Sequence, residues 1–314
     1  MPVAAVVAAG LLVAFPIWSA PWESSRYATG ILRDMLVLAI LALSLDLLVG
    51  SAGMPSLGQS AYFGAGAYAA AIAGQRLGSD DLLLGLGAAI LVSALLAFVI
   101  GAVAVRAAGI FFLMLTLAFA QMVFAVAFQA ADITGGSNGF SGVRRPMFLG
   151  LDFNGPDALF HLVAVVFLIV LLLVWRIRSS AYGRALIGLR EKERRMRALG
   201  YDTTRLRLSA FVLAGAIAGV GGALQAYSIR FVSTNDVGVA RSVEAFVSVL
   251  IGGASTLLGP VVGSVVVLFI ERVLPSFNVA FAETVLGLVF IIFVLAGRQG
   301  IVGLARVAYA RARG

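Results

Sequence analysis

The chain has almost no cysteine or histidine, the residues that thiol chemistry and many metal sites use. It contains no cysteine and one histidine, His161, among 314 residues. Disulfides and thiolate metal sites are therefore excluded, and one histidine is too few for a histidine-based metal centre. The sequence predicts that this chain binds no metal and no cofactor of its own.

Charge is also scarce. Charged residues make up 12% of the chain and hydrophobic residues 61%, whereas a soluble globular protein averages about 25% charged and roughly 45–50% apolar residues. Lipid must therefore be the solvent for much of the surface. The net charge of +8 does not indicate nucleic-acid binding, because the basic residues form no face interleaved with aromatic side chains.

Long apolar runs account for most of the sequence. A membrane helix needs about 20 mostly apolar residues, and an all-α, polytopic membrane protein with about ten transmembrane helices is expected, forming a single transmembrane domain over residues 1–314. The first run lacks the basic start of a signal peptide and has Pro16 and Trp18 near its end, so we interpret it as a retained helix. The expected spans lie near 3–19, 31–50, 58–76, 82–105, 108–130, 158–176, 207–229, 243–254 (short), 257–274 and 280–297.

The distribution of arginine predicts the orientation. Segment 177–206 carries eight basic residues, and the C-terminal tail carries Arg298, Arg306, Arg311 and Arg313. The positive-inside rule makes both cytoplasmic, so an even number of spans lies between them and the short run 243–254 counts as one. The N-terminus is then also cytoplasmic, and segment 131–157 is an external loop.

Two segments, 48–59 and 250–260, interrupt apolar runs with glycine, serine or threonine, and proline. Such breaks persist in a membrane only inside protein or beside a water-filled cavity, and a pair of them in two inverted-repeat-like halves indicates a transport pathway. The alternative, compatible with the first, is tight helix packing through Gly64, Gly66 and Ala70. The predicted path residues are Asp46, Gly50, Gly53, Ser56, Gln59, Gly252, Gly253 and Ser255.

Asp46 is the most deeply placed of the few acidic residues in the spans, with Glu244 and Glu283 nearer to breaks or ends. An acidic group at the centre of a membrane helix costs roughly 2.5–3.5 kcal/mol on insertion scales and faces a cavity or a partner. Asp46 is therefore the best candidate for lining a path.

The basic segment 177–206 also has a helical pattern. Glu191 with Arg195 and Glu193 with Arg197 are spaced for i,i+4 ion pairs, and Gly200 is a helix stop. The helix could be solvated, lie on anionic lipid or insert its apolar stripe into a partner protein, and the pattern leaves these three open. The stripe consists of Tyr182, Leu186, Leu189, Met196 and Leu199.

At this segment the chain resembles the permeases of branched-chain amino-acid ABC importers (LivH/LivM type), through GRALIGLREKERRMRALGY (183–201). Similar stretches follow the family order at 43–71, at 134–139 (TGGSNG), at 247–264 and at 297–304. The sequence departs from the family pattern where Asp46 replaces the usual Asn, where Arg194 and Arg195 replace alanines, and where the closing segment lacks its usual Pro.

The resemblance implies a permease subunit in the cytoplasmic (inner) membrane of a prokaryote, with segment 177–206 as the cytoplasmic loop that couples to the ATPase. The implied partners are a second, LivH-like permease, two ABC ATPase subunits that use ATP and Mg²⁺, and a periplasmic or extracellular solute-binding protein. The chain lacks a G-x-x-x-x-G-K-[ST] phosphate loop and is not expected to be an enzyme. The implied coupling residues are Gly183, Arg184, Leu186, Leu189, Glu193, Ala198, Leu199 and Gly200.

Two alternatives remain open from the sequence. A stand-alone secondary transporter or channel would explain the broken helices without partners, although such proteins commonly carry more intramembrane ionisable groups than Asp46 and Glu283. Within the importer family, the substrate is a branched-chain amino acid, another amino acid, or urea or a small amide. Affinity purification from the native membrane separates the first alternative from the importer.

Overall fold

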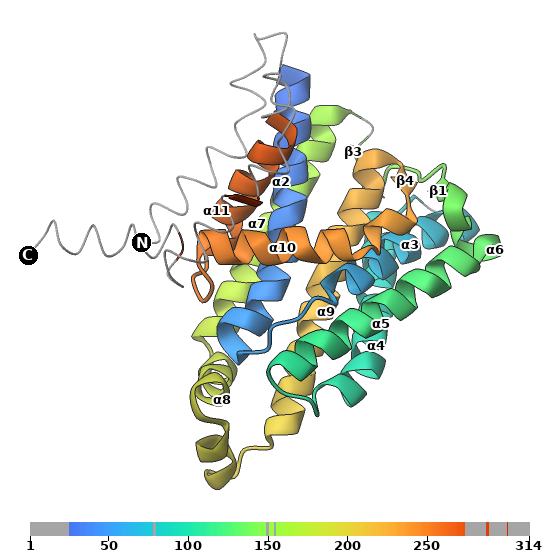
Figure 1. The fold of residues 1–314 in the computed structure, drawn as a ribbon. Helices are drawn as coiled ribbons and strands as arrows, with labels where there is room; N and C mark the ends of the chain where they lie inside the picture. The colour runs from blue at the N-terminus through green and yellow to red at the C-terminus, as the bar shows by residue number, and fades with distance from the viewer. Residues whose placement is uncertain are drawn as a thin grey trace, which may run out of the picture.

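The computed structural model describes residues 25–77, 80–148, 151–153, 155–273, 287–288 and 300. These residues form a bundle of helices with two short β-ribbons (Figure 1). The helices are α2 (Ser25–Asp46), α3 (Gln59–Leu77), α4 (Leu82–Ala104), α5 (Ile110–Gln129), α6 (Ala131–Thr134), α7 (Pro156–Ser179), α8 (Ala181–Ala198), α9 (Thr203–Ile229), α10 (Val239–Gly252) and α11 (Gly259–Leu268). Two π-helical turns, η1 (Leu47–Ala52) and η4 (Phe269–Val273), continue α2 and α11, and η2 (Gly136–Asn138) and η3 (Thr234–Asp236) are 3₁₀ turns.

The helices lie where the apolar runs predict them. Within the described ranges, each expected span coincides with a helix to within a few residues. Five stretches are long and apolar enough to cross a membrane: Tyr27–Ala52, Leu82–Ala104, Ile110–Gln129, Asp157–Ser179 and Thr203–Ile229. The expected spans near 3–19 and 280–297 lie outside the described residues, apart from 287–288, so ten crossings stay a prediction.

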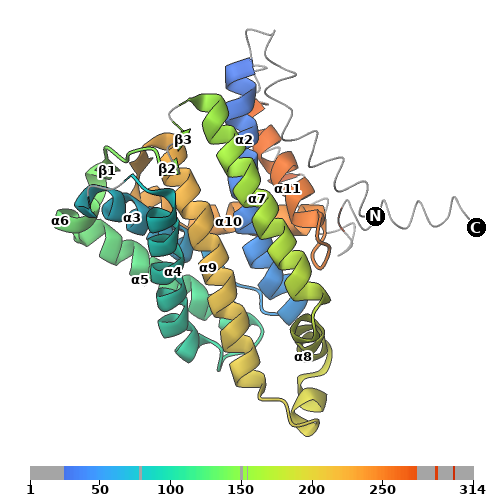
Figure 2. The same cartoon turned by 180° about the vertical axis from the view of Figure 1, so that it is seen from behind.

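Helix α2 is the centre of the bundle. In its most apolar window 94% of the residues are buried, against 22% in α5. It packs against α7, α9, α10 and α11 (Figures 1 and 2). The peripheral α4 and α5 instead expose large apolar side chains, such as Leu91 and Phe111, which is the pattern of helices solvated by lipid.

Helices α3, α4 and α9 approach closely through small residues. A Cβ at Gly222 of α9 would overlap the carbonyl oxygen of Phe63 of α3, and one at Gly66 of α3 would overlap the backbone of Gly219. Small residues let membrane helices approach in this way, which gains dispersion contacts. The close-packing interpretation of Gly66 is thereby confirmed.

We expect Gly222→Ala to destabilise the bundle by about 1–3 kcal/mol, because a well-packed backbone contact must open to admit the methyl group. Gly87→Ala in α4 is the matched control, since nothing lies within 4 Å of a Cβ built there. Thermal unfolding in detergent measures both variants. Equal midpoints for the two would show that the α3–α9 contact contributes nothing to stability.

Segments 131–157 and 177–206 connect the long helices at opposite ends of the bundle. Helix α7 runs from segment 131–157 to α8, and α9 runs back from α8 toward segment 131–157 (Figure 2). Two antiparallel ribbons form there: β1 (Phe140–Ser141) pairs with β4 (Phe231–Val232), and β2 (Met147–Phe148) pairs with β3 (Leu151–Asp152). Segments 131–157 and 177–206 are thus at opposite ends of the bundle.

Candidate translocation and coupling site

Both predicted helix breaks are present. After η1 the chain turns at Gly53, whose φ of +70° is in the left-handed region, and Met54 N donates to Leu48 O at 3.0 Å. The backbone is then non-helical until α3 begins at Gln59. The second break lies between Gly252 and Gly259, and Gly253 and Ser255 both have positive φ there.

The two breaks contact each other, although about two hundred residues separate them in sequence. Ser255 N donates to Asp46 Oδ1 at 2.9 Å, and Ser255 Oγ donates to Gly50 O at 2.9 Å. Gly50 has no room for a side chain, because a Cβ there would overlap the Asp46 carboxylate and approach Ser255 N to 2.6 Å. Three of the predicted path residues therefore form one junction.

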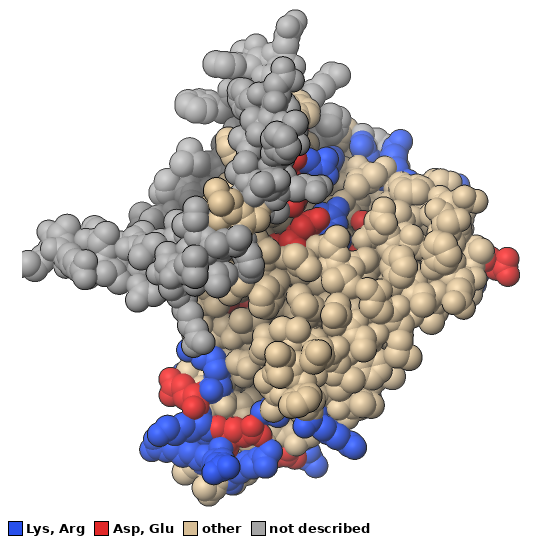
Figure 3. Space-filling view, viewed as in Figure 1, with Lys and Arg blue, Asp and Glu red and all other residues tan. Residues whose placement is uncertain are grey.

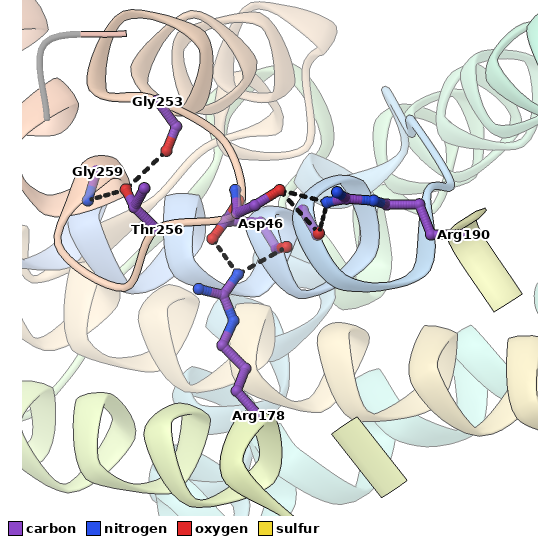
Figure 4. Close-up of polar contacts among 8 residues, drawn as sticks. Asp46, Arg178, Arg190, Gly253, Thr256 and Gly259 are labelled. Atoms are coloured by element: carbon purple, nitrogen blue, oxygen red, sulfur yellow. Dashed lines mark hydrogen bonds and ion pairs between the residues drawn. The ribbon is translucent and has the colours of Figure 1, made fainter. Parts of the chain in front are cut away.

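Asp46 is neutralised by an arginine from another helix. A terminal nitrogen of Arg178, in the last turn of α7, donates to Asp46 Oδ2 and, at 3.2 Å, to the backbone oxygen of Asp46 (Figure 4). The side chain of Asp46 is 0% exposed and that of Arg178 is 14% exposed. A carboxylate and a guanidinium buried together avoid the large free-energy cost of burying either charge alone. That Asp46 also lines a solute path stays a prediction.

Arg190 connects helix α8 to both breaks. Its guanidinium donates to Gly50 O in the first break and to Ser255 Oγ in the second (Figure 4). The stem of the same side chain lies over Gly53, where a Cβ would approach the Cβ of Arg190 to 3.1 Å. One side chain of α8 therefore contacts each of the two interruptions.

Hydrogen bonds within the second break also stabilise its turn. Thr256 Oγ1 donates to Gly253 O at 2.8 Å and accepts from Gly259 N at 3.0 Å (Figure 4). A Cβ on Gly252 would overlap Gly259 O. The predicted path residues Gly252 and Gly253 thus shape the turn between α10 and α11. Ser56, near the end of the first break, and Gln59, the first residue of α3, make no hydrogen bond to the described residues of this junction.

The apolar stripe of α8 is buried against its own chain, which corrects the sequence-based interpretations. Leu186, Leu189 and Met196 are buried, and α8 packs on η1, α7 and α9. Tyr182 is half-buried, and its hydroxyl shares a hydrogen bond of 2.7 Å with Ser209 Oγ. Only Leu199 is well exposed, at 66%. The sequence pattern is compatible with a stripe that faces solvent, lipid or a partner, and it does not show that adjacent helices cover the stripe.

The polar side of α8 also differs from expectation. Glu193 pairs with Arg197 at 2.7 Å as predicted, and it pairs with Arg207 of α9 as well. The expected pair between Glu191 and Arg195 is not formed in the part of the chain that the structure describes. The helix is kinked at Lys192, where φ is −151°, so these two side chains do not keep ideal i,i+4 geometry.

The predicted end of α8 is confirmed at Gly200. Its φ is +87°, which favours glycine. Tyr201 N donates to Met196 O at 3.1 Å and Gly200 N to Arg197 O at 3.0 Å, the hydrogen bonds of a Schellman motif.

The implied coupling residues divide by accessibility. Gly183 is buried, and a Cβ there would overlap the carbonyl oxygens of Ile177 and Arg178. Arg184 is exposed and donates to Ser179 O at 3.0 Å. Ala198, Leu199 and Gly200 are exposed, as are Ile187 and Tyr201, which the sequence did not single out. The exposed group, which includes Leu199 but not the buried stripe residues Leu186, Leu189 and Met196, is available to another protein.

Sequence reasoning missed Arg178 and Arg190 as parts of the site. In the sequence, both contribute only to the positive charge of segment 177–206, which predicts the orientation in the membrane. Asp46 gave an indirect signal, because a carboxylate in an apolar helix requires a cation from elsewhere, but nothing in the sequence specifies which arginine.

The described residues contain no group of three or more His, Asp or Glu side chains able to hold a metal ion.

Comparison with known proteins places the chain in a family. Residues 27–295 match the family model described as the branched-chain amino acid transport system / permease component. The high-affinity branched-chain amino acid transport system permease protein LivM of Salmonella typhimurium is 29% identical over 94% of this chain and 74% of its own length. LivM of Escherichia coli is 27% identical over the same shares, and the probable LivM of Methanocaldococcus jannaschii is 25% identical over 77% of this chain and 80% of its own.

No solved structure matches the chain significantly. The family match covers well over half of the chain, from the third residue of α2 through α11, and so includes both breaks and α8. The chain therefore belongs to the family of branched-chain amino acid transport system permease components.

Proposed function

We propose that this chain is the LivM-like permease subunit of an ABC importer that takes up branched-chain amino acids across the cytoplasmic membrane of a prokaryote. The family membership and the three LivM relatives support this assignment. The observation that carries the mechanism is the junction at which Arg190 of α8 contacts both helix breaks.

The end of the bundle that carries α8 faces the cytoplasm in this proposal. Charged side chains gather over α8 in the space-filling view, next to a broad uncharged surface (Figure 3). Exposed basic residues there include Arg184, Lys192, Arg194 and Arg195, and the positive-inside rule supports a cytoplasmic side. Segment 131–157, at the opposite end, then faces the solute-binding protein.

The coupling mechanism follows from the junction. ATPase subunits bind the exposed end of α8, around Leu199 and Tyr201, and move the helix when ATP binds or is released. Because Arg190 holds Gly50 O and Ser255 Oγ, a displacement of α8 shifts both breaks together. Two breaks that move together can open or close a path that a second, LivH-like permease completes. ATP and Mg²⁺ are used by the ATPase subunits and not by this chain.

The experiment is purification of the tagged chain from its native membrane in mild detergent, followed by mass spectrometry and uptake assays in liposomes. We expect a second permease and two ATPases to co-purify, and leucine uptake to require ATP and the binding protein. Leu199→Glu should abolish ATPase recovery, whereas Ala108→Glu, in the exposed turn between α4 and α5, should not. A chain that is recovered alone and transports on an ion gradient would disprove the proposal.

A further inference from the structure

A second group of charged side chains lies in the half of the bundle away from α8. Figure 3 shows charged side chains gathered at the level of α10 and above it, beside the broad uncharged surface. Asp34 precedes Asp46 by twelve residues in α2, which corresponds to about 18 Å at about 1.5 Å per residue. We call this group, which comes from α2, α10 and η4, the distal cluster: Arg33, Asp34, Arg241, Glu244, Glu271 and Arg272.

The distal cluster is placed where lipid is a poor solvent for it. Asp34 belongs to the stretch Tyr27–Ala52, which is long and apolar enough to cross a membrane. The side chains of Asp34, Arg241 and Glu244 are still between 19% and 22% exposed. Charged groups within membrane spans face protein or a water-filled cavity, because hydrocarbon does not solvate them. The cluster therefore marks a face of this subunit that water or another subunit covers.

A cavity lies between the distal cluster and the apolar core. Its polar lining consists of Asp34, Arg241, Arg272 and, from α9, Gln225, and its empty space is about 300 Å³ including the open mouth. Gln225 is 4% exposed, and its carboxamide makes no hydrogen bond to the part of the chain that the structure describes. A buried carboxamide without a partner costs free energy, so this cavity contains a polar group that a ligand would satisfy.

Asp34 and Arg272 form the weakest ion pair of the cavity. Their closest atoms are 3.8 Å apart, and the side chain of Arg272 is 51% exposed. A charge-assisted hydrogen bond is about 2.7–2.9 Å long, so separating these two groups breaks no hydrogen bond. Arg241 differs, because it donates to Glu244 at 2.8 Å. The cavity thus holds one anion and one cation that a ligand can part.

We propose that this cavity is a solute-binding site on the external half of the path, in which Asp34 binds the ammonium group and Arg272 the carboxylate of an α-amino acid. This inference rests on the proposed function. A zwitterion that enters between two opposite charges replaces one long ion pair with two hydrogen-bonded ones and leaves the net charge unchanged. Gln225 donates to the same carboxylate, which gives its carboxamide a partner.

The remaining lining fits the side chain of a branched-chain amino acid. It is apolar and includes Leu38 and Leu41 of α2 and Phe63 of α3, against which an aliphatic side chain is removed from water. This subunit supplies only one wall of the site, because Arg272 is half exposed at its edge. A second permease closes the other side, as a path shared between two subunits requires.

Arg272→Gln separates solute binding from the support of Asp34. We expect the KM for leucine uptake by the assembled importer to rise at least tenfold, because the carboxylate loses its cation. Arg33→Gln is the matched control, since Arg33 also pairs with Asp34, at 3.5 Å, and does not line the cavity. Its KM should stay within twofold of the wild type. An equal rise in both variants would assign both arginines a structural role and overturn the proposal, as would an unchanged KM in Arg272→Gln.

A labelling experiment detects the site without transport or a binding protein. The chain has no native cysteine, so a water-soluble methanethiosulfonate reagent modifies this subunit only at an introduced cysteine. In the purified importer, Gln225→Cys should be labelled in the nucleotide-free or the vanadate-trapped condition, and leucine should slow the labelling at least fivefold. Ala223→Cys is the control and should stay unlabelled, because Ala223 lies on the same helix, is 0% exposed and does not line the cavity.

Two leucine analogues test the assignment of the charges. 4-Methylpentanoate lacks the ammonium group and 3-methylbutylamine lacks the carboxylate, so each should protect Gln225→Cys only at concentrations at least tenfold higher than leucine. Protection by either analogue at the concentration of leucine would overturn the assignment of Asp34 and Arg272.

Absence of labelling of Gln225→Cys in both conditions would overturn the proposal, as would labelling that leucine does not slow or equal labelling of Ala223→Cys. Leucine uptake by the wild-type importer is measured first, because it tests the proposed function separately. If the wild type carries another α-amino acid, that solute replaces leucine as the protecting ligand. Transport of a solute without an ammonium group and a carboxylate would overturn the inference.

Discussion

Replacing Arg190 by alanine is expected to reduce solute uptake by about tenfold or more while ATP hydrolysis continues. The guanidinium donates to Gly50 O and to Ser255 Oγ, and a hydrogen bond from a charged group contributes about 1.5–3 kcal/mol. Loss of one such bond changes an equilibrium by about tenfold, since 1.4 kcal/mol corresponds to a factor of ten. Without this connection α8 moves with the ATPase, but the two breaks do not follow.

The measurement is the ratio of leucine transported to ATP hydrolysed by the reconstituted importer. Arg194→Ala is the matched control, because Arg194 is exposed on the same helix and makes no side-chain hydrogen bond or ion pair to any described residue. Arg190→Lys should be intermediate, because an ammonium group cannot reproduce the planar geometry of the guanidinium. Normal coupling in Arg190→Ala would show that α8 acts on the breaks by another route.

Removing the carboxylate of Asp46 is expected to have the largest effect on stability. Asp46→Leu leaves the guanidinium of Arg178, which is 14% exposed, without its counter-ion, and breaking a buried ion pair costs about 3–5 kcal/mol. It also removes the acceptor for Ser255 N. We therefore expect little folded protein at 37 °C, measured as the monodisperse fraction after membrane extraction and as the unfolding midpoint.

Two further variants show whether the ion pair causes this loss. Asp46→Asn keeps an oxygen that can accept from Ser255 N, so it should be milder than Asp46→Leu. The double variant Asp46→Leu with Arg178→Met should recover part of the lost stability, because it replaces both charges with apolar groups. A double variant that is no more stable than Asp46→Leu would indicate that the charge of Arg178 is not the cause.

Much of the site could be located from the sequence. Glycine, proline and serine in segments 48–59 and 250–260 indicated the two breaks, because several such residues close together lower the local preference for a helix. Arginine and apolar spacing indicated helix α8, and Gly200 indicated its end. These properties are local, since they depend on residues within a few positions of each other along the chain.

The contacts between these elements could not be predicted in the same way. The pattern of α8 indicated an apolar stripe but not its cover, because an amphipathic helix buries its stripe equally well against its own chain, lipid or a partner. Glu193 was expected to pair with Arg197 and was found to pair with Arg207 of α9 as well. The i,i+4 spacing rule applies within one helix. It gives no information about which residues of a neighbouring helix, such as α9, will be in contact.

The sequence by itself determined that this is a membrane protein, where its described helices lie to within about six residues, and where two of them break. These are consequences of composition and local backbone preference. The tertiary structure alone decided that Asp46 meets Arg178, that Arg190 joins the two breaks, and that Gln59 is buried without a hydrogen-bond partner among the described residues. Each of these depends on side chains brought together from distant segments, and the position of a long arginine or an amide is set by helices packed around it rather than by its neighbours in sequence.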